Sequence, residues 1–156
     1  PYMPQPEKIA QAIQADLAQV GIRARIVSLE WATYLDKVFN GHHDLCLLGW
    51  TGDNGDPDNF LYVLLDKMAA VKPAQNVAFY KSDELHDILV GARTQTDPAI
   101  RTQLYREAQQ IIHRDAPWVP LVHATQTAAF GRQVDGFQLH PTGSKWFSTT
   151  RIAAAN

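Results

Sequence analysis

The sequence contains a single cysteine, Cys46, among its 156 residues. One thiol cannot form a disulfide within the chain. This thiol lies in the apolar run Leu-Cys-Leu-Leu at residues 45–48, where a buried, inert side chain is more common than a nucleophile. The cysteine count therefore leaves the redox compartment open and gives no candidate for cysteine catalysis.

Strong charge and long apolar runs are also missing. The net charge is -2, which gives no basic footprint for binding nucleic acid. No apolar run approaches the roughly 18 residues that a membrane-spanning helix needs. The apolar fraction of 46% is ordinary for a globular protein and argues against disorder. The composition predicts one globular domain, with neither a nucleic-acid partner nor a membrane span.

The first residues lack both an initiator methionine and a signal peptide, because "PYMPQPEKIAQAI" enters a predicted helix almost at once. We therefore expect this chain to be a piece of a longer one. Any export signal would then lie outside the sequence.

Signatures of catalysis and of cofactor binding are missing as well. The sequence has no nucleophile elbow, phosphate-binding loop, zinc-ligand spacing or dinucleotide fingerprint. The adjacent His42 and His43 would point apart in a turn, and His113 suits a structural position at a helix C-terminus. We predict no catalytic residue, no metal site and no cofactor, and hence a protein that is not an enzyme.

Apolar residues at helical spacing predict five helices. Pro6 suits the first turn of one helix, and Gly21 suits its end. Ser82 and Asp97 are typical N-caps of two later helices. The predicted helices cover residues 6–20, 31–39, 59–65, 83 to about 92, and 98 to about 113.

Segments rich in β-branched residues predict strands at residues 22–29 and 44–50, on either side of the helix at 31–39. Strand, helix and strand in this order form a βαβ unit, which predicts an α/β fold. Open α/β sheets bind ligands beyond the carboxyl ends of their parallel strands. Trp50 and Asp53 lie at that end of the second strand. Two further extended segments are expected at residues 118–124 and 126–134.

An acidic cluster, Thr-Gly-Asp-Asn-Gly-Asp-Pro-Asp-Asn, follows the second predicted strand. Its glycine and proline positions do not match the ligand spacing of a calcium loop, and nothing in it marks a glycosidase pair. Asp56 and Asp58 suit a turn followed by a helix start. Asp53 precedes these residues directly after the strand, so we predict that its carboxylate faces a ligand.

The segment "EWATYLDKVFNGHHDLCLLGWTGDNGDPDNFL", residues 30–61, closely resembles the C-terminal part of the dipeptide-binding subfamily of ABC-transporter substrate-binding proteins. These are the family-5 extracellular solute-binding proteins. Two further stretches, "PEKIAQAIQADLAQVGIRARIV" and "RTQLYREAQQIIHRDAPWVPLVHATQTAAF", extend the resemblance over nearly the whole chain. The Trp-Thr-Gly-Asp-Asn-Gly-Asp-Pro-Asp-Asn segment is its most specific part.

The resemblance implies a periplasmic-binding-protein-like lobe, in which the βαβ unit has flanking helices. Such a lobe belongs to a two-lobed receptor that closes on its ligand by a hinge motion. Residues 1–130 would form most of the C-terminal ligand-binding lobe, and residues 131–156 would return to the other lobe. A tail that lacks its packing partner exposes apolar side chains, so we expect the isolated piece to self-associate.

The resemblance also implies a ligand site. Asp53 would meet the α-ammonium group of a peptide, with a wall of strand-end residues beside it and Trp31 lining a side-chain pocket. The basic residue that holds the ligand's carboxylate in dipeptide binders would precede Pro1. The residues implied in ligand binding are Tyr2, Trp31, Gly49, Trp50, Thr51, Gly52 and Asp53.

The function implied is that of the substrate-binding component of an ABC importer. It would capture short peptides, above all dipeptides, in the periplasm and deliver them to the membrane permease subunits. One alternative is hydrolysis by Asp53, Asp56 and Asp58. Another is binding of glutathione, haem or a nickel complex on the same fold.

Overall fold

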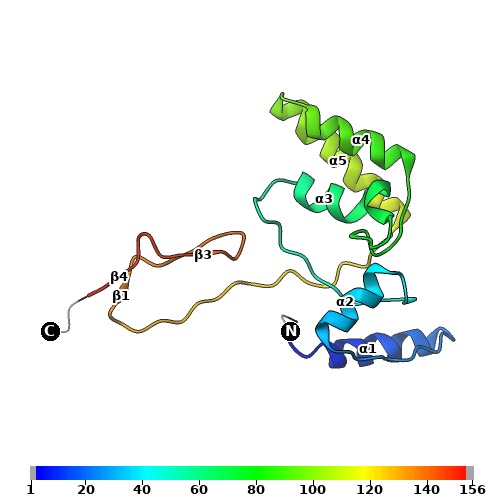
Figure 1. The fold of residues 1–156 in the computed structure, drawn as a ribbon, viewed down its shortest axis with the longest axis horizontal. Helices are drawn as coiled ribbons and strands as arrows, with labels where there is room; N and C mark the ends of the chain where they lie inside the picture. The colour runs from blue at the N-terminus through cyan, green and yellow to red at the C-terminus, as the bar shows by residue number, and fades with distance from the viewer. Residues whose placement is uncertain (1–2, 154–156) are drawn as a thin grey trace.

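The structure, a computed structural model, describes residues 3–153 of the chain. It consists of a helical body and a small β-hairpin tail, which lie well apart (Figure 1). The elements of the body are α1 (Pro6–Gln19), α2 (Trp31–Phe39), α3 (Asp58–Leu65), the 3-10 helix η1 (Lys67–Ala70), α4 (Asp83–Thr94) and α5 (Pro98–Asp115). The strands of the tail are β1 (Val134–Asp135), β2 (Gln138–Leu139), β3 (Lys145–Trp146) and β4 (Arg151–Ile152).

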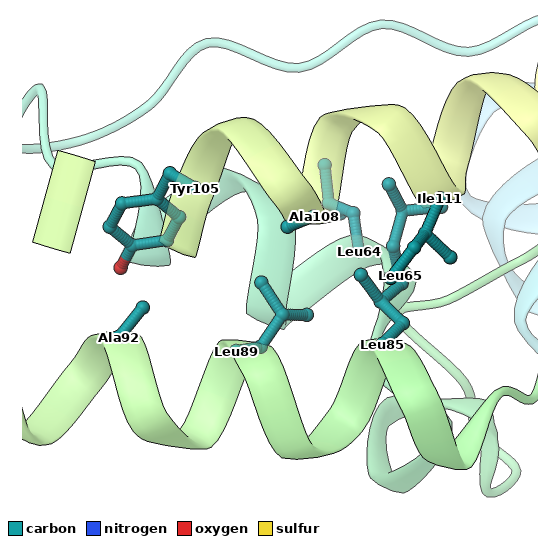
Figure 2. Close-up of a cluster of buried hydrophobic side chains, with 8 residues drawn as sticks. All are labelled: Leu64, Leu65, Leu85, Leu89, Ala92, Tyr105, Ala108 and Ile111. Carbon is teal, nitrogen blue, oxygen red and sulfur yellow. The ribbon is translucent and has the colours of Figure 1, made fainter. Parts of the chain in front are cut away.

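The main core lies where α3 packs against the antiparallel pair α4 and α5 (Figure 2). In α4, Leu85, Leu89 and Ala92 recur at helical spacing, so one stripe of the helix is completely buried. Tyr105 on α5 closes one end of the cluster. The buried residues of this core are Leu64, Leu65, Leu85, Leu89, Ala92, Tyr105, Ala108 and Ile111.

The predicted helices are confirmed, and so are two of their caps. The hydroxyl of Ser82 accepts a hydrogen bond from the backbone N–H of Leu85, and Asp97 accepts from those of Ala99 and Ile100. A third cap comes from Glu30, whose carboxylate accepts from the first turn of α2. Each cap satisfies backbone donors that have no partner inside the helix.

Some residues that the pattern placed in the core are exposed. Ile100, expected to face inward from α5, is 51% exposed, and Tyr105 is the first buried residue of that helix. Helix α1 has no buried residue, and Val20 at its end is 72% exposed. An apolar stripe is buried only where another element covers it, and among residues 3–153 no other helix packs closely on α1.

The two strands expected at residues 22–29 and 44–50 do not form, although the helix between them does. A strand is defined by hydrogen bonds to a neighbouring strand, and the only paired strands among residues 3–153 are in the tail. Residues 22–29 instead run beside α1, where the Gln14 side chain donates to the carbonyl of Ala24. Their apolar side chains stay exposed, with Ile22 and Val27 each at 53%.

The segment from Asp66 to Tyr80, which contains η1 and leads to α4, is tied together by buried polar groups. Asp66 is fully buried, and its carboxylate accepts from the backbone N–H of Met68 and lies 2.8 Å from Nδ1 of His86. The amide of Asn76, also fully buried, donates to the carbonyls of Asp66 and Tyr80. Buried polar groups need such partners, so this segment is held in one conformation despite its lack of periodicity.

The tail contains two antiparallel pairs, β1 with β4 and β2 with β3. Residues 119–131 lead to it as a long trace without secondary structure. The extended segment expected at 118–124 therefore forms no strand, and of the one expected at 126–134 only Val134, the first residue of β1, lies in a strand. Exposed apolar side chains follow this path, including Val119 at 80% and Val122 at 83%. The separate role predicted for residues 131–156 stays a prediction. Within residues 3–153, no helix has the length and hydrophobicity needed to cross a membrane.

Candidate functional site

The acidic segment lies between α2 and α3 and leads directly into α3 (Figure 1). Asp53, at its start, is exposed. Its backbone N–H donates to Oδ1 of Asn59 at 2.7 Å, and its carboxylate Oδ2 lies 3.4 Å from the amide nitrogen of Asn59. Among the ion pairs of residues 3–153, none involves Asp53. The charge of this carboxylate is therefore held in place without being neutralised.

Trp31 is linked through Tyr34 to the segment that precedes Gly49 and Trp50. Trp31 stacks on Tyr34, with ring centroids 5.8 Å apart. The Tyr34 hydroxyl donates to the carbonyl of Leu47 at 2.7 Å, which ties α2 to the segment just before Gly49. Trp50 is 40% exposed.

The remaining predicted site residues are Thr51, Gly52 and Tyr2. Thr51 is exposed and Gly52 half-buried, so they continue the surface between Trp50 and Asp53. Tyr2 lies outside the described residues. Trp31 is thus linked through Tyr34 to the stretch before Gly49, and Asp53 is linked through Asn59 to α3. Consecutive residues of the chain join these two groups.

The other two acids of the cluster are paired with arginines from distant helices. Asp56 accepts from Nη2 of Arg101 at 2.8 Å and from the backbone N–H of Asp58 at 2.9 Å. Asp58 Oδ1 lies 3.1 Å from Nε of Arg93, although the alignment is not that of a hydrogen bond. Asp56 therefore supports the start of α3 as expected. Asp58 does not cap the helix, because it is the first helical residue and its charge faces α4.

The pKa values of the two acids shift in opposite directions. The hydrogen bond from Arg101 lowers the pKa of the Asp56 carboxyl. Burial raises the pKa of Asp58, and the charge of Arg93 only partly offsets this. An acid with a lowered pKa contributes stability above its unfolded-state pKa and loses it as the pH falls through the folded-state value.

Replacing Asp56 by Asn should therefore reduce stability in a pH-dependent way. The amide still accepts the Asp58 N–H, so mainly the charge pair with Arg101 is lost. Because this pair is partly exposed, we expect a loss of about 0.5–1 kcal/mol at pH 7. The loss should be constant above about pH 4, the unfolded-state value, and disappear as the pH falls through the lowered pKa. Urea unfolding of both variants from pH 7 to pH 3 measures it; a pH-independent difference would contradict the pairing.

The arrangement offers the exposed carboxylate of Asp53, three residues after the exposed indole of Trp50, and such a carboxylate suits recognition of a cation. It does not suit hydrolysis, because Asp56 and Asp58 are engaged by arginines. Cys46 is half-buried, and burial raises the pKa of its thiol, which disfavours the reactive thiolate. The part of the chain that the structure describes contains no group of three side chains able to hold a metal ion.

Sequence reasoning missed the partners of the acidic cluster. The sequence predicts Asn59 only as a helix residue and does not connect Arg93 or Arg101 with the cluster. Asn59 had a signal, since it stands six positions after Asp53 at the start of a predicted helix. The arginines had none, because Arg101 is 45 residues from Asp56 in the sequence and only the packing of α5 brings them together.

Comparison with known proteins gives a consistent result. Residues 1–71 match the family model described as "Bacterial extracellular solute-binding proteins, family 5 Middle". Di/tripeptide-binding protein 4 of Pseudomonas aeruginosa is 41% identical over 152 residues, which are 97% of this chain and 28% of that protein. The chain is a relative of the family-5 solute-binding proteins. It spans about 28% of the length of that relative.

Two further similar proteins add a solved structure and a second kind of ligand among the relatives. The periplasmic binding protein DppA of Helicobacter pylori, solved in complex with the peptide STSA, has a TM-score of 0.79 and 39% identity, covering 94% of this chain and 29% of that one. Heme-binding protein A of Haemophilus influenzae is 36% identical over 140 residues, 90% of this chain and 25% of that protein. The likeness to the solved DppA structure confirms the expected periplasmic-binding-protein-like fold, although the two strands of the expected βαβ unit do not form among residues 3–153. The relatives are named as binding proteins.

Proposed function

We propose that this chain is part of the substrate-binding component of an ABC importer that captures short peptides, most suitably dipeptides. In this proposal it works in the periplasm and delivers the peptide to the membrane permease subunits. The observation that supports it best is the exposed carboxylate of Asp53, which has a neutral amide partner and no cationic one among residues 3–153. Similarity to proteins named for di- and tripeptide binding supports the ligand class.

The chemistry of a peptide ligand fits this carboxylate. A free peptide has an α-ammonium group, which needs a charged partner once a closing receptor removes water from it. A hydrogen bond to a charged group contributes roughly 1.5–3 kcal/mol. Haem has no ammonium group and would leave Asp53 uncompensated, so the geometry favours peptide over haem despite the haem-binding relative.

Tryptophan fluorescence of the full-length receptor tests this proposal. We expect a dipeptide such as Ala-Ala to change the emission, because closure alters the surroundings of Trp31 and Trp50. The combined Trp31→Phe and Trp50→Phe variant should lose most of the change. The matched control is Trp118→Phe, since Trp118 packs edge-on against Phe60 in the helical body. A full response in the double variant, or a response to haem alone, would contradict the proposal.

A further inference from the structure

The three acids of the segment at residues 53–58 have partners of two kinds. Asp56 and Asp58 face the guanidinium groups of Arg101 and Arg93, which neutralise their charge. The partner of Asp53 is the neutral amide of Asn59. A neutral partner can orient a carboxylate while leaving its negative charge available to a third group.

Asn59 contacts Asp53 at two points. Its side-chain oxygen accepts the Asp53 backbone N–H at 2.7 Å, which fixes the backbone at that residue. Its side-chain nitrogen lies 3.4 Å from Oδ2 of Asp53, which favours one orientation of the carboxylate. Both contacts come from one side chain in the first turn of α3, so the position of Asp53 follows that of α3.

Helix α3 is itself firmly placed. At its C-terminal end, Leu64 and Leu65 belong to the buried core shared with α4 and α5 (Figure 2). At its N-terminal end, Arg93 of α4 pairs with Asp58, and the guanidinium of Arg93 stacks on the Tyr62 ring at 4.2 Å from its centroid. Asn59 therefore has a fixed position, and its side chain can hold the exposed carboxylate of Asp53 in one orientation.

We propose that Asn59 is a positioning residue that orients the Asp53 carboxylate for the ammonium group of a peptide ligand. This inference rests on the proposed function. Preorganisation strengthens binding because the carboxylate does not have to be ordered when the ligand arrives. Asn59 acts through Asp53 and does not itself contact the ligand.

A double-mutant cycle in the full-length receptor tests the proposal, with Ala-Ala binding measured by calorimetry. Asn59→Ala should weaken binding about three- to tenfold, the equivalent of one net hydrogen bond. In an Asp53→Asn background, Asn59→Ala should change the affinity by less than about twofold, because the charge that it positions is gone. The matched control is Asn54→Ala, which removes an acceptor for the Asp56 N–H in the same loop without touching Asp53.

The outcomes separate the inference from the proposed function. If Asp53→Asn binds Ala-Ala at wild-type strength, the proposed function is wrong. If Asp53→Asn weakens binding but Asn59→Ala has no effect, or the two effects add fully, the positioning role is wrong. Equal losses from Asn54→Ala and Asn59→Ala would mean general loosening of the loop and would also overturn it. If Asn59→Ala unfolds, Asn59→Ser, which keeps a group suited to a helix start, replaces it with the same expectation.

Discussion

Asp53→Ala in the full-length receptor should weaken dipeptide binding about tenfold or more, which corresponds to roughly 1.4 kcal/mol. The carboxylate is exposed and has no cationic partner among residues 3–153, so its charge is available to a ligand. Removing it leaves the peptide ammonium group without a counter-charge in a site from which closure excludes water. Isothermal titration calorimetry with Ala-Ala measures the change in Kd.

The same substitution should leave thermal stability almost unchanged. Asp53 belongs to no helix, and the one hydrogen bond of its side chain among residues 3–153 is the long one to Asn59. Surface substitutions of this kind usually change stability by less than about 0.5 kcal/mol. Calorimetric binding at wild-type strength would show that Asp53 does not meet the ligand, and a large fall in melting temperature would give it a structural role.

Leu89→Ala should destabilise the chain by about 2–5 kcal/mol, the range for truncating a fully buried leucine. Leu89 has no exposed surface and lies in the middle of α4, facing α3 and α5 (Figure 2). Truncation removes apolar contacts and leaves a cavity that fixed helices cannot fill completely. Urea unfolding followed by far-UV circular dichroism measures the loss.

The matched control is the next residue of the same helix. Val90 is 39% exposed and points away from the core, so Val90→Ala should cost less than about 1 kcal/mol. Equal losses at the two positions would mean that helix propensity, rather than packing, dominates the stability of α4. That result would contradict the core described above.

The helices could be predicted because their signals are local. Ser82 and Asp97 have the side chains that satisfy the free N–H groups of a helix start, and each stands next to a run with helical spacing. Gly21, with φ of 83°, ends the first helix in a backbone conformation that favours glycine. In each case, residues within a few positions of one another carry the information.

The strands could not be predicted in the same way. Residues 22–29 and 44–50 have the composition of strands, but a strand also needs a neighbour that supplies hydrogen bonds. That neighbour is non-local, and no pattern within the segment reports whether it is present. The exposed Ile22 and Val27 show the result, because apolar residues with strand-like spacing are left without a sheet to cover them.

The candidate site divides in the same manner. By itself the sequence determined the helix positions and singled out Asp53. Asp53 could be singled out because the acidic segment and the helix that follows it are adjacent in the sequence. Only the tertiary structure decided which acids keep their charge available. The packing of α4 and α5 brings Arg93 and Arg101 to Asp58 and Asp56, leaving Asp53 with the neutral Asn59. Charge pairing depends on distance in space, and residues as far apart in sequence as Asp56 and Arg101 become neighbours only through the core that the helices share.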